Sequence, residues 1–332
     1  MTDLNVWVVS VSYRSARLMI ECLRSLEKER STPGVNLRAV IVDNASGDFP
    51  ILSQAVAENG WHAWITLIVA PRNGGFAYGN NLGIQLALES GAADYLLLLN
   101  PDTQVRPGAI GSLLAFLRSR PDVAIAGTSF ENADGTEWPM AFRFPSIGTE
   151  FCAALALGFV TRLLGDRTVA RRMSPVAQQV DWVSGAAMMV RPEVFRTIGG
   201  LDENYFLYFE ETDFCFRARR AGFATWYFPQ SRVMHIMGQS TDVVTETWSE
   251  LKRLPAYWFE SRRRYLAVTL GTPAAMMADL LVLLAYPIGH LKRTLLRRTH
   301  TAIPHYLGDL WRHSILRSRN RQLAPIRTLR MP

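Results

Sequence analysis

The first 127 residues alternate short apolar segments with segments of helical spacing, and this alternation constrains the fold more than any other feature of the sequence. Runs of five to seven residues rich in Val, Ile and Leu, separated by helices, are typical of a mostly parallel sheet with both faces covered. We therefore predict an α/β fold with a Rossmann-like sheet flanked by helices. Strands are expected at 6–12, 37–42, 65–69, 95–99 and 123–127, with helices at 15–28, 49–59 and 107–118 and one that ends near residue 90.

Polar residues follow three of these strands at the point where each strand ends. The second strand runs into Asp43, the third into a glycine-rich turn that begins at Asn73, and the fourth into Asn100-Pro101-Asp102. Because open α/β sheets bind ligands at the carboxyl ends of their strands, we expect these side chains to converge on one edge. Neither a P-loop nor the GxGxxG pattern follows the first strand. We assign Asp48 a local role as the cap of the helix at 49–59.

The pattern changes after residue 127. Small residues from Ser184 to Ala187 permit a ligand to approach the backbone closely. We expect irregular strands at 130–144, an apolar helix at 151–164, a basic segment at 165–179, a strand at 188–190, a helix from 192 to 199, and closing strands at 224–228 and 232–235.

Three carboxylates lie within four positions in the stretch from Phe206 to Gly222. Glu210, Glu211 and Asp213 are followed by three arginines, so we predict a helix with acids in its first turn and bases in its last. The helix dipole lowers the pKa of such carboxyls, whereas repulsion between adjacent acids raises the pKa of one of them. The stretch suits a general base, although ordinary acidic capping of a helix gives the same pattern.

The ordered motifs resemble inverting family-2 glycosyltransferases, and look closest to their rhamnosyltransferase-like members of cell-surface polysaccharide synthesis. The resemblance covers roughly residues 5 to 240 and rests on order and spacing, because no single motif is specific. The motifs read VSYRS, VDNASGD, NGGFAYGNN, LLLNPD, WVSGAAMMVRP, GGLDENYFLYFEETDFCFRARRAG and VMHIMGQS. The resemblance implies a GT-A fold, a dTDP- or UDP-linked sugar donor such as dTDP-rhamnose, a divalent metal (Mg²⁺ or Mn²⁺), and a glycan or polyprenyl-linked acceptor.

The resemblance also implies roles for individual residues. Glu211 corresponds to the catalytic base, with Asp213 as an orienting or acceptor-binding group. The donor is assigned to Ser12, Tyr13, Asp43, Asn73, Gly74, Asn100 and Asp102, the acceptor to Trp182, Gly185 and Asp202, and the metal to Asp102 and His235. A core position for Trp182 and a hydrogen-bonded position closing a strand for His235 stay open.

The segment that corresponds to the family's DXD motif departs from it, because Asn100 stands at the first acidic position. A divalent cation held by Asp102 and the donor's pyrophosphate neutralises the leaving group. An amide carries less charge than a carboxylate, so metal affinity is expected to be lower, and nearby bases such as Arg72 can share the neutralisation. Inverting transfer is a single displacement, which needs one base for the incoming hydroxyl and no enzyme nucleophile.

Positive charge is concentrated at the C-terminal end of the chain. The net charge is +7, but from residue 251 onwards fifteen Lys and Arg face three Asp and Glu. We predict a catalytic domain at 1–240, divided into nucleotide-sugar binding at 1–127 and an acceptor and catalytic part at 128–240, followed by a basic helical extension at 241–332. The three arginines from Arg262 to Arg264 are expected on the surface of a helix at 257–270.

The apolar patches at 274–296 are interrupted by Pro287 and Gly289, and no run of eighteen uncharged apolar residues exists, so we predict no transmembrane helix. We expect this region to lie on an anionic membrane surface; a helical cap or a homodimer contact is the alternative. The N-terminus lacks the features of a signal peptide, and the three scattered cysteines suit a reducing compartment. We therefore predict a cytoplasmic protein, peripheral at the inner membrane face.

Two other functions were weighed against glycosyl transfer. A sugar-phosphate nucleotidyltransferase shares this fold class, but a glycine-rich signature loop with a following basic residue is absent near the first strand. A nucleic-acid-binding protein suits the high pI, but the positive charge is confined to the tail and no nucleic-acid module is recognised, so we predict no nucleic-acid partner.

Overall fold

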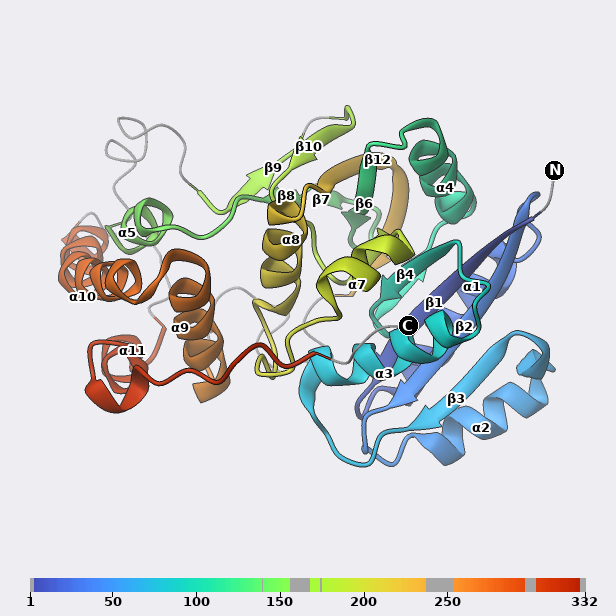
Figure 1. Ribbon diagram of the computed structural model, residues 1–332, viewed down its shortest axis with the longest axis horizontal. Helices are drawn as coiled ribbons and strands as arrows, with labels where there is room; N and C mark the ends of the chain where they lie inside the picture. Colours follow the sequence, from blue (N-terminus) through green and yellow to red (C-terminus); the bar gives the residue numbers. More distant parts are fainter. Residues whose placement is uncertain are drawn as a thin grey trace.

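A curled, mostly parallel sheet runs through the centre of the computed structural model (Figure 1). The structure describes residues 3–138, 140–155, 168–173, 175–236, 253–295 and 303–328. The strands of the sheet are β1 (Leu4–Ser12), β2 (Val35–Asp43), β3 (Ile65–Val69), β4 (Tyr95–Leu99), β5 (Thr103–Val105), β6 (Val123–Glu131), β7 (Glu137–Trp138), β10 (Gln178–Val180), β11 (Ala187–Val190) and β12 (Ala224–His235). A separate antiparallel pair is formed by β8 (Met140–Phe142) and β9 (Ala170–Arg172).

The main strands follow the order β10-β12-β6-β11-β4-β1-β2-β3. β1 is parallel to β2 and β4, β2 is parallel to β3, and β11 inserts antiparallel between β4 and β6. In register, Ser12 at the end of β1 lies beside Asp43 at the end of β2, and Asp43 lies beside Val69. The predicted α/β fold is confirmed, and the carboxyl ends of three strands lie level at one edge.

Helices cover both faces of the sheet because side chains alternate along each strand. The helices are α1 (Ala16–Glu29), α2 (Phe49–Glu58), α3 (Gly75–Glu89), α4 (Ala109–Ser119), α7 (Pro192–Ile198) and α8 (Glu210–Arg220). On β1, Val6 and Val8 pack with α1, α2 and α4, whereas Trp7 and Val9 pack with α3, α7 and α8.

Several boundaries differ from the prediction. The two expected closing strands are one strand, β12, with a register shift between Phe228 and Arg232. The expected helix start at Pro107 is wrong, because Gly108 in the left-handed conformation (φ 80°) precedes α4. The apolar helix begins earlier, as α5 (Ile147–Leu155), and the rest of its predicted range lies outside the described residues. The short strand β5 was not predicted.

The C-terminal helices α9 (Ala256–Leu270), α10 (Thr272–Leu295) and α11 (Tyr306–His313) gather beside α5 (Figure 1). The prediction that three arginines lie on the surface of α9 is wrong for two of them. Arg262 is buried between Glu150 and Asp279, and Arg264 is buried against Asp202. Each faces a carboxylate, which is the condition under which a protein buries a guanidinium. The domain boundary at residue 240 falls outside the described residues and stays a prediction.

The helix α10 corrects the predicted interruption at Pro287 and Gly289, because it runs through both residues. A side chain at Gly289 would lie 2.5 Å from the carbonyl oxygen of Ala154, so this glycine permits α10 to pack closely against α5. An 18-residue window within residues 272–292 has a mean hydropathy of 1.6, and this segment is long and apolar enough to cross a membrane, contrary to the predicted short run. This is weak evidence for a span, since a core helix of a soluble protein passes the same test.

Candidate active site

A cavity of about 350 Å³ lies where the strands β1, β2 and β4 end. Three of the predicted donor residues line it: Tyr13, Asn73 and Asn100. The other lining residues were not predicted from the sequence; they include Asn44, Phe76, Phe206, Leu207 and Tyr257. Tyr257 belongs to α9, within the predicted extension, and no motif marks it. Phe206 and Leu207 lie just before the acidic helix, so their position in the chain was the available signal.

Asp48 connects the end of β1 to the start of α2 by hydrogen bonds. Its Oδ2 accepts hydrogen bonds from the Ser12 hydroxyl (2.6 Å) and the Ser15 amide (2.9 Å). The predicted capping role of Asp48 is wrong, because its side chain makes no cap hydrogen bond. Asp43 takes that role, since its Oδ2 accepts from the amide of Phe49, the first residue of α2. Ser12 and Asp43 are both buried and do not line the cavity.

The glycine-rich turn connects the cavity to the acidic helix. Asn73 Oδ1 accepts hydrogen bonds from the Asn44 side chain and the Gly75 amide, both at 3.0 Å. Gly75 has a φ of +84°, and a Cβ there would overlap the carbonyl oxygen of Phe206. That oxygen accepts a hydrogen bond of 2.9 Å from the Phe76 amide. The turn therefore needs glycine at this position, both for its φ and for the close approach. Gly74 beside it packs against the ring of Tyr78.

The two residues assigned to a metal are neighbours although 133 positions separate them in sequence. His235, the last residue of β12, pairs with Thr103 of β5, and its Nε2 lies 3.3 Å from Asp102 Oδ1. Nearby in sequence, the buried Oδ1 of Asn100 has no hydrogen-bond partner among the described residues. Carboxylate, amide and imidazole groups are suitable ligands for Mn²⁺ or Mg²⁺. No cluster of three or more His, Cys, Asp or Glu side chains that could hold a metal occurs in the described part of the chain.

The acidic helix begins from strained backbone. Tyr208 and Phe209 have φ values of 70° and 71°, the left-handed region that aromatic residues rarely adopt. Burial raises the pKa of Glu211 above its ordinary value, and the backbone amides of Gly185 and of the helix start oppose this only in part. For Glu210, burial and then repulsion by Glu211 raise the pKa. The expected lowering by the helix dipole is therefore outweighed.

Gly185 lies between Glu211 and Phe76; Phe76 lines the cavity, whereas Gly185 and Glu211 do not. A Cβ at Gly185 would lie 3.3 Å from the ring of Phe76 and 3.5 Å from Glu211 Cβ. Oε2 of Glu211 is buried and has no hydrogen-bond partner among the described residues. A carboxylate with a raised pKa, one uncommitted oxygen and a ligand-sized cavity beside it has the properties of a general base.

The other two acids of the predicted site point elsewhere. Asp213 is fully buried on α8, and its Oδ2 accepts a hydrogen bond of 2.7 Å from Arg217. Asp202 is also fully buried and accepts from Arg264 (2.8 Å) and from the backbone amide of Arg327 (3.0 Å). Like Glu211, neither lines the cavity, and both connect the acidic helix region to arginines. Trp182 stacks on Phe142 with ring centres 4.1 Å apart and lies away from the cavity lining.

Comparison with known proteins identifies the family. The family model described as glycosyltransferase-like family 2 matches residues 5–260. An N-acetylglucosaminyl-diphospho-decaprenol L-rhamnosyltransferase of Mycobacterium tuberculosis is 30% identical over 251 residues, which cover 73% of this chain and 78% of that protein. A dTDP-rhamnosyl transferase of Shigella flexneri is 25% identical, over 71% of each chain.

Solved structures support the fold. A mannosyltransferase from Pyrobaculum calidifontis in complex with GDP-Man and Mn²⁺ aligns over 97% of this chain and 83% of its own, with a TM-score of 0.54 and 13% identity. The S. aureus TarS 1–349 fragment in complex with UDP aligns over 92% of this chain and 80% of its own, with a TM-score of 0.52 and 14% identity. At these identities the similarity shows the GT-A fold alone.

Proposed function

We propose, from the premise that this chain belongs to glycosyltransferase family 2 and is a glycosyltransferase, that it transfers rhamnose from dTDP-rhamnose to a glycan or polyprenyl-diphosphate-linked acceptor in cell-surface polysaccharide synthesis. The observation that carries the reaction type is the position of Glu211, which lies next to Gly185 near the strand-end cavity with a buried, uncommitted Oε2. The choice of sugar is supported by the names of the relatives, which include several rhamnosyltransferases.

The proposed reaction is a single displacement with inversion. The bond from the anomeric carbon to the nucleoside diphosphate oxygen breaks as the bond to the acceptor oxygen forms. Glu211 takes the proton of the acceptor hydroxyl, which a carboxylate with a raised pKa does more effectively than an ordinary one. The donor occupies the cavity lined by Tyr13, Asn73 and Asn100, with the glycine-rich turn along one side.

A divalent cation fits the group formed by Asp102, His235 and the buried amide oxygen of Asn100. When bound, such an ion supplies Lewis-acid neutralisation of the departing diphosphate. Asp102 contributes one carboxylate, and the aromatic rings of Phe130 and Trp138 hold the imidazole of His235 in place. Because the group contains one carboxylate, we expect weaker metal binding than at a site with two.

We place the enzyme at the cytoplasmic face of the membrane through α10. One side of this helix packs on α5 and α9, whereas the opposite side presents large apolar side chains that are 43 to 73% exposed. These lie three or four positions apart and so form one stripe: Met277, Leu280, Leu284, Ile288, Leu291 and Leu295. An apolar stripe on a basic region suits the interface of an anionic bilayer, where a polyprenyl-linked acceptor resides.

The test is release of the nucleoside diphosphate from a panel of dTDP-, UDP- and GDP-sugars, with Mg²⁺, Mn²⁺ or EDTA. We expect hydrolysis and binding of dTDP-rhamnose in preference to the others, with activity reduced by EDTA. Binding of a different nucleotide sugar would correct the donor and keep the reaction type. Folded protein that binds no nucleotide sugar, or that releases pyrophosphate from a nucleoside triphosphate and sugar phosphate, would contradict the proposal.

A further inference from the structure

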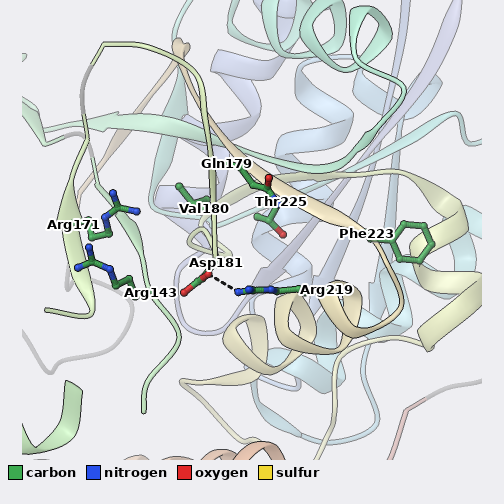
Figure 2. A pocket seen from close by; sticks show the side chains of 8 residues that line it. All are labelled: Arg143, Arg171, Gln179, Val180, Asp181, Arg219, Phe223 and Thr225. Atoms are coloured by element: carbon green, nitrogen blue, oxygen red, sulfur yellow. Dashed lines mark hydrogen bonds and ion pairs between the residues drawn. The ribbon is translucent and has the colours of Figure 1, made fainter. Parts of the chain in front are cut away.

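A second cavity, of about 380 Å³, lies at the C-terminal end of α8 and is basic. Figure 2 shows Arg143 and Arg171 opposite the ion pair of Asp181 with Arg219, whose atoms are 2.7 Å apart. Arg171 in β9 pairs with Ala141 in β8, so Arg143, two residues further, lies diagonally on the same face. Three guanidinium groups and one carboxylate line this cavity, which leaves a net charge of about +2.

Two segments connect the basic cavity to Glu211: α8 and residues 181–185, which run side by side in opposite directions. Gly185 contacts Glu211 at the start of α8, the backbone of Val183 contacts Cys215, and Asp181 contacts Arg219 in the last turn. Eight residues of helix rise about 12 Å, so Arg219 at the cavity lies about 12 Å along α8 from Glu211.

An aromatic pair lies along this path. Trp182, between Asp181 and Val183, stacks on Phe142, and its indole N–H donates a hydrogen bond of 2.9 Å to the carbonyl oxygen of Arg143. The pair therefore fixes the backbone that carries one arginine of the cavity. A half-buried aromatic surface between a general base and a basic cavity is suited to the face of a sugar ring.

We propose that the basic cavity binds the diphosphate of a polyprenyl-diphosphate-linked sugar acceptor while the sugar hydroxyl reaches Glu211. The proposal rests on the proposed function and specifies its acceptor. A diphosphate that links a sugar to a lipid carries two negative charges, which equal the net charge of the cavity. Arginine forks bind phosphate oxygens with paired hydrogen bonds, and the partly enclosed cavity strengthens them. The sugar and its diphosphate must together bridge the roughly 12 Å of helix between Glu211 and Arg219.

The experiment measures binding of N-acetylglucosaminyl-diphospho-farnesol to the full-length protein by calorimetry, with saturating dTDP present to fill the donor cavity. The comparison ligand is farnesyl N-acetylglucosaminide, which lacks the diphosphate. We expect the double variant Arg143→Gln/Arg171→Gln to bind the diphosphate ligand at least tenfold more weakly than wild type, with dTDP affinity unchanged. The matched control is Arg24→Gln, which removes an exposed arginine on α1 and should change neither affinity.

The outcomes separate this inference from the proposed function. The inference is overturned if wild type and the double variant bind the diphosphate ligand equally well, or if wild type binds both ligands equally well. In either case, binding of dTDP by wild type leaves the proposed function standing. Failure of wild type to bind dTDP counts against the function itself. A variant that loses binding to phosphatidylglycerol vesicles but keeps the diphosphate ligand would show that the cavity binds phospholipid headgroups, and the inference would be wrong. If circular dichroism shows the double variant unfolded, the single variant Arg171→Gln decides by the same criteria.

Discussion

Two regions of this molecule, the strand-end cavity and the C-terminal helices, bury charged or polar groups in different surroundings. At the strand-end cavity, Oδ1 of Asn100 and Oε2 of Glu211 are buried with no hydrogen-bond partner in the described residues. Among the C-terminal helices, Arg262 is paired with both Glu150 and Asp279. A buried polar group without a partner costs about 1–3 kcal/mol. Arg262 also has a buried Nη2 without a partner among the described residues, so the regions differ in what their charges connect. Asn100 lines a cavity, whereas the ion pairs of Arg262 join α9 to α5 and α10.

The ion pairs of the helical region also reach the acidic helix. Arg264 of α9 holds Asp202, and Arg217 of α8 bonds the carbonyl oxygens of Ile198 and Gly200 while holding Asp213. The ion pairs of Asp202 and Asp213 therefore fix the position of α8, the helix that carries Glu211. The comparison predicts that substitutions at the cavity reduce activity with little loss of stability, and that substitutions in the helical region do the opposite.

The largest effect is expected from Glu211→Gln. Loss of a general base lowers kcat by about 10²–10⁴-fold, whereas donor affinity should stay near that of wild type because the substitution preserves shape. Single-turnover transfer assays and dTDP titration measure the two quantities. Glu193→Gln, at an exposed position on α7, is the matched control. Near-normal turnover in Glu211→Gln together with an inactive, folded Asp213→Asn would move the base to Asp213.

Arg262→Met tests the helical region. It leaves Glu150 and Asp279 buried without their cation, and breaking a buried pair on one side costs about 3–5 kcal/mol. Urea unfolding should show this loss in the free energy of unfolding, with donor affinity retained wherever the protein is folded. Arg319→Met, at an exposed position, should change stability by less than about 0.5 kcal/mol. A loss below about 1 kcal/mol in Arg262→Met would mean that the pairs do not hold the helices together.

Gly75→Ala affects both properties, because Gly75 forms the cavity wall and contacts the segment before α8. A non-glycine residue at positive φ costs about 1–3 kcal/mol, and the clash with the Phe206 carbonyl adds to this. The control is Gly91→Ala, where φ is +68° but nothing lies within 4 Å of the new Cβ. Both variants should lose stability, but only Gly75→Ala should lose donor affinity. Equal donor affinity in the two would show that the turn does not shape the donor site.

The exposed stripe on α10 is tested with Leu284→Glu/Ile288→Glu. Charges on the apolar face should lower binding to anionic vesicles in a flotation assay by about tenfold or more, since each buried CH₂ contributes about 0.8 kcal/mol to such binding. Ile51→Glu places a charge at a comparably exposed apolar residue on α2 and should leave flotation unchanged. Absence of wild-type flotation would remove the membrane proposal and leave a homodimer contact as the alternative for the stripe.

The smallest effect is in the pH profile. Glu211 must be ionised to accept a proton, and burial raises its pKa above the ordinary 4.5. Activity should therefore fall, as pH decreases, at a higher pH than an ordinary glutamate would give. The measurement is kcat/KM against pH with the Glu211→Gln variant as the control that lacks this acid limb. Burial penalises the charged form of Glu211. The contribution of Glu211 to folding stability should therefore decrease as pH rises through its raised pKa. An acid limb at or below the ordinary value would contradict the burial of this carboxyl.

Much of the fold could be predicted from local patterns. All five strands predicted up to residue 127 are present, and β3 and β4 have the predicted bounds, because strands of a parallel sheet are short apolar runs with clear polar ends. Asp43, Asn73 and Asp102 were expected to converge because parallel strands end at one edge, and of these Asn73 lines the cavity, together with Asn100. Local patterns failed where a distant contact decided the outcome. Pro287 and Gly289 lie within a helix because α10 packs on α5, and Asp48 bonds β1 instead of capping its own helix.

The sequence by itself determined the family, the α/β order and the presence of an acidic helix after a glycine-rich turn, since these depend on residue type and spacing along the chain. Only the tertiary structure decided what each acid contacts. Glu210, Glu211 and Asp213 are all carboxylic acids, but the side chain of Asp213 pairs with Arg217, whereas that of Glu211 lies beside Gly185. Burial then raises the pKa of Glu211 against the helix dipole, and burial depends on how distant segments pack around a side chain.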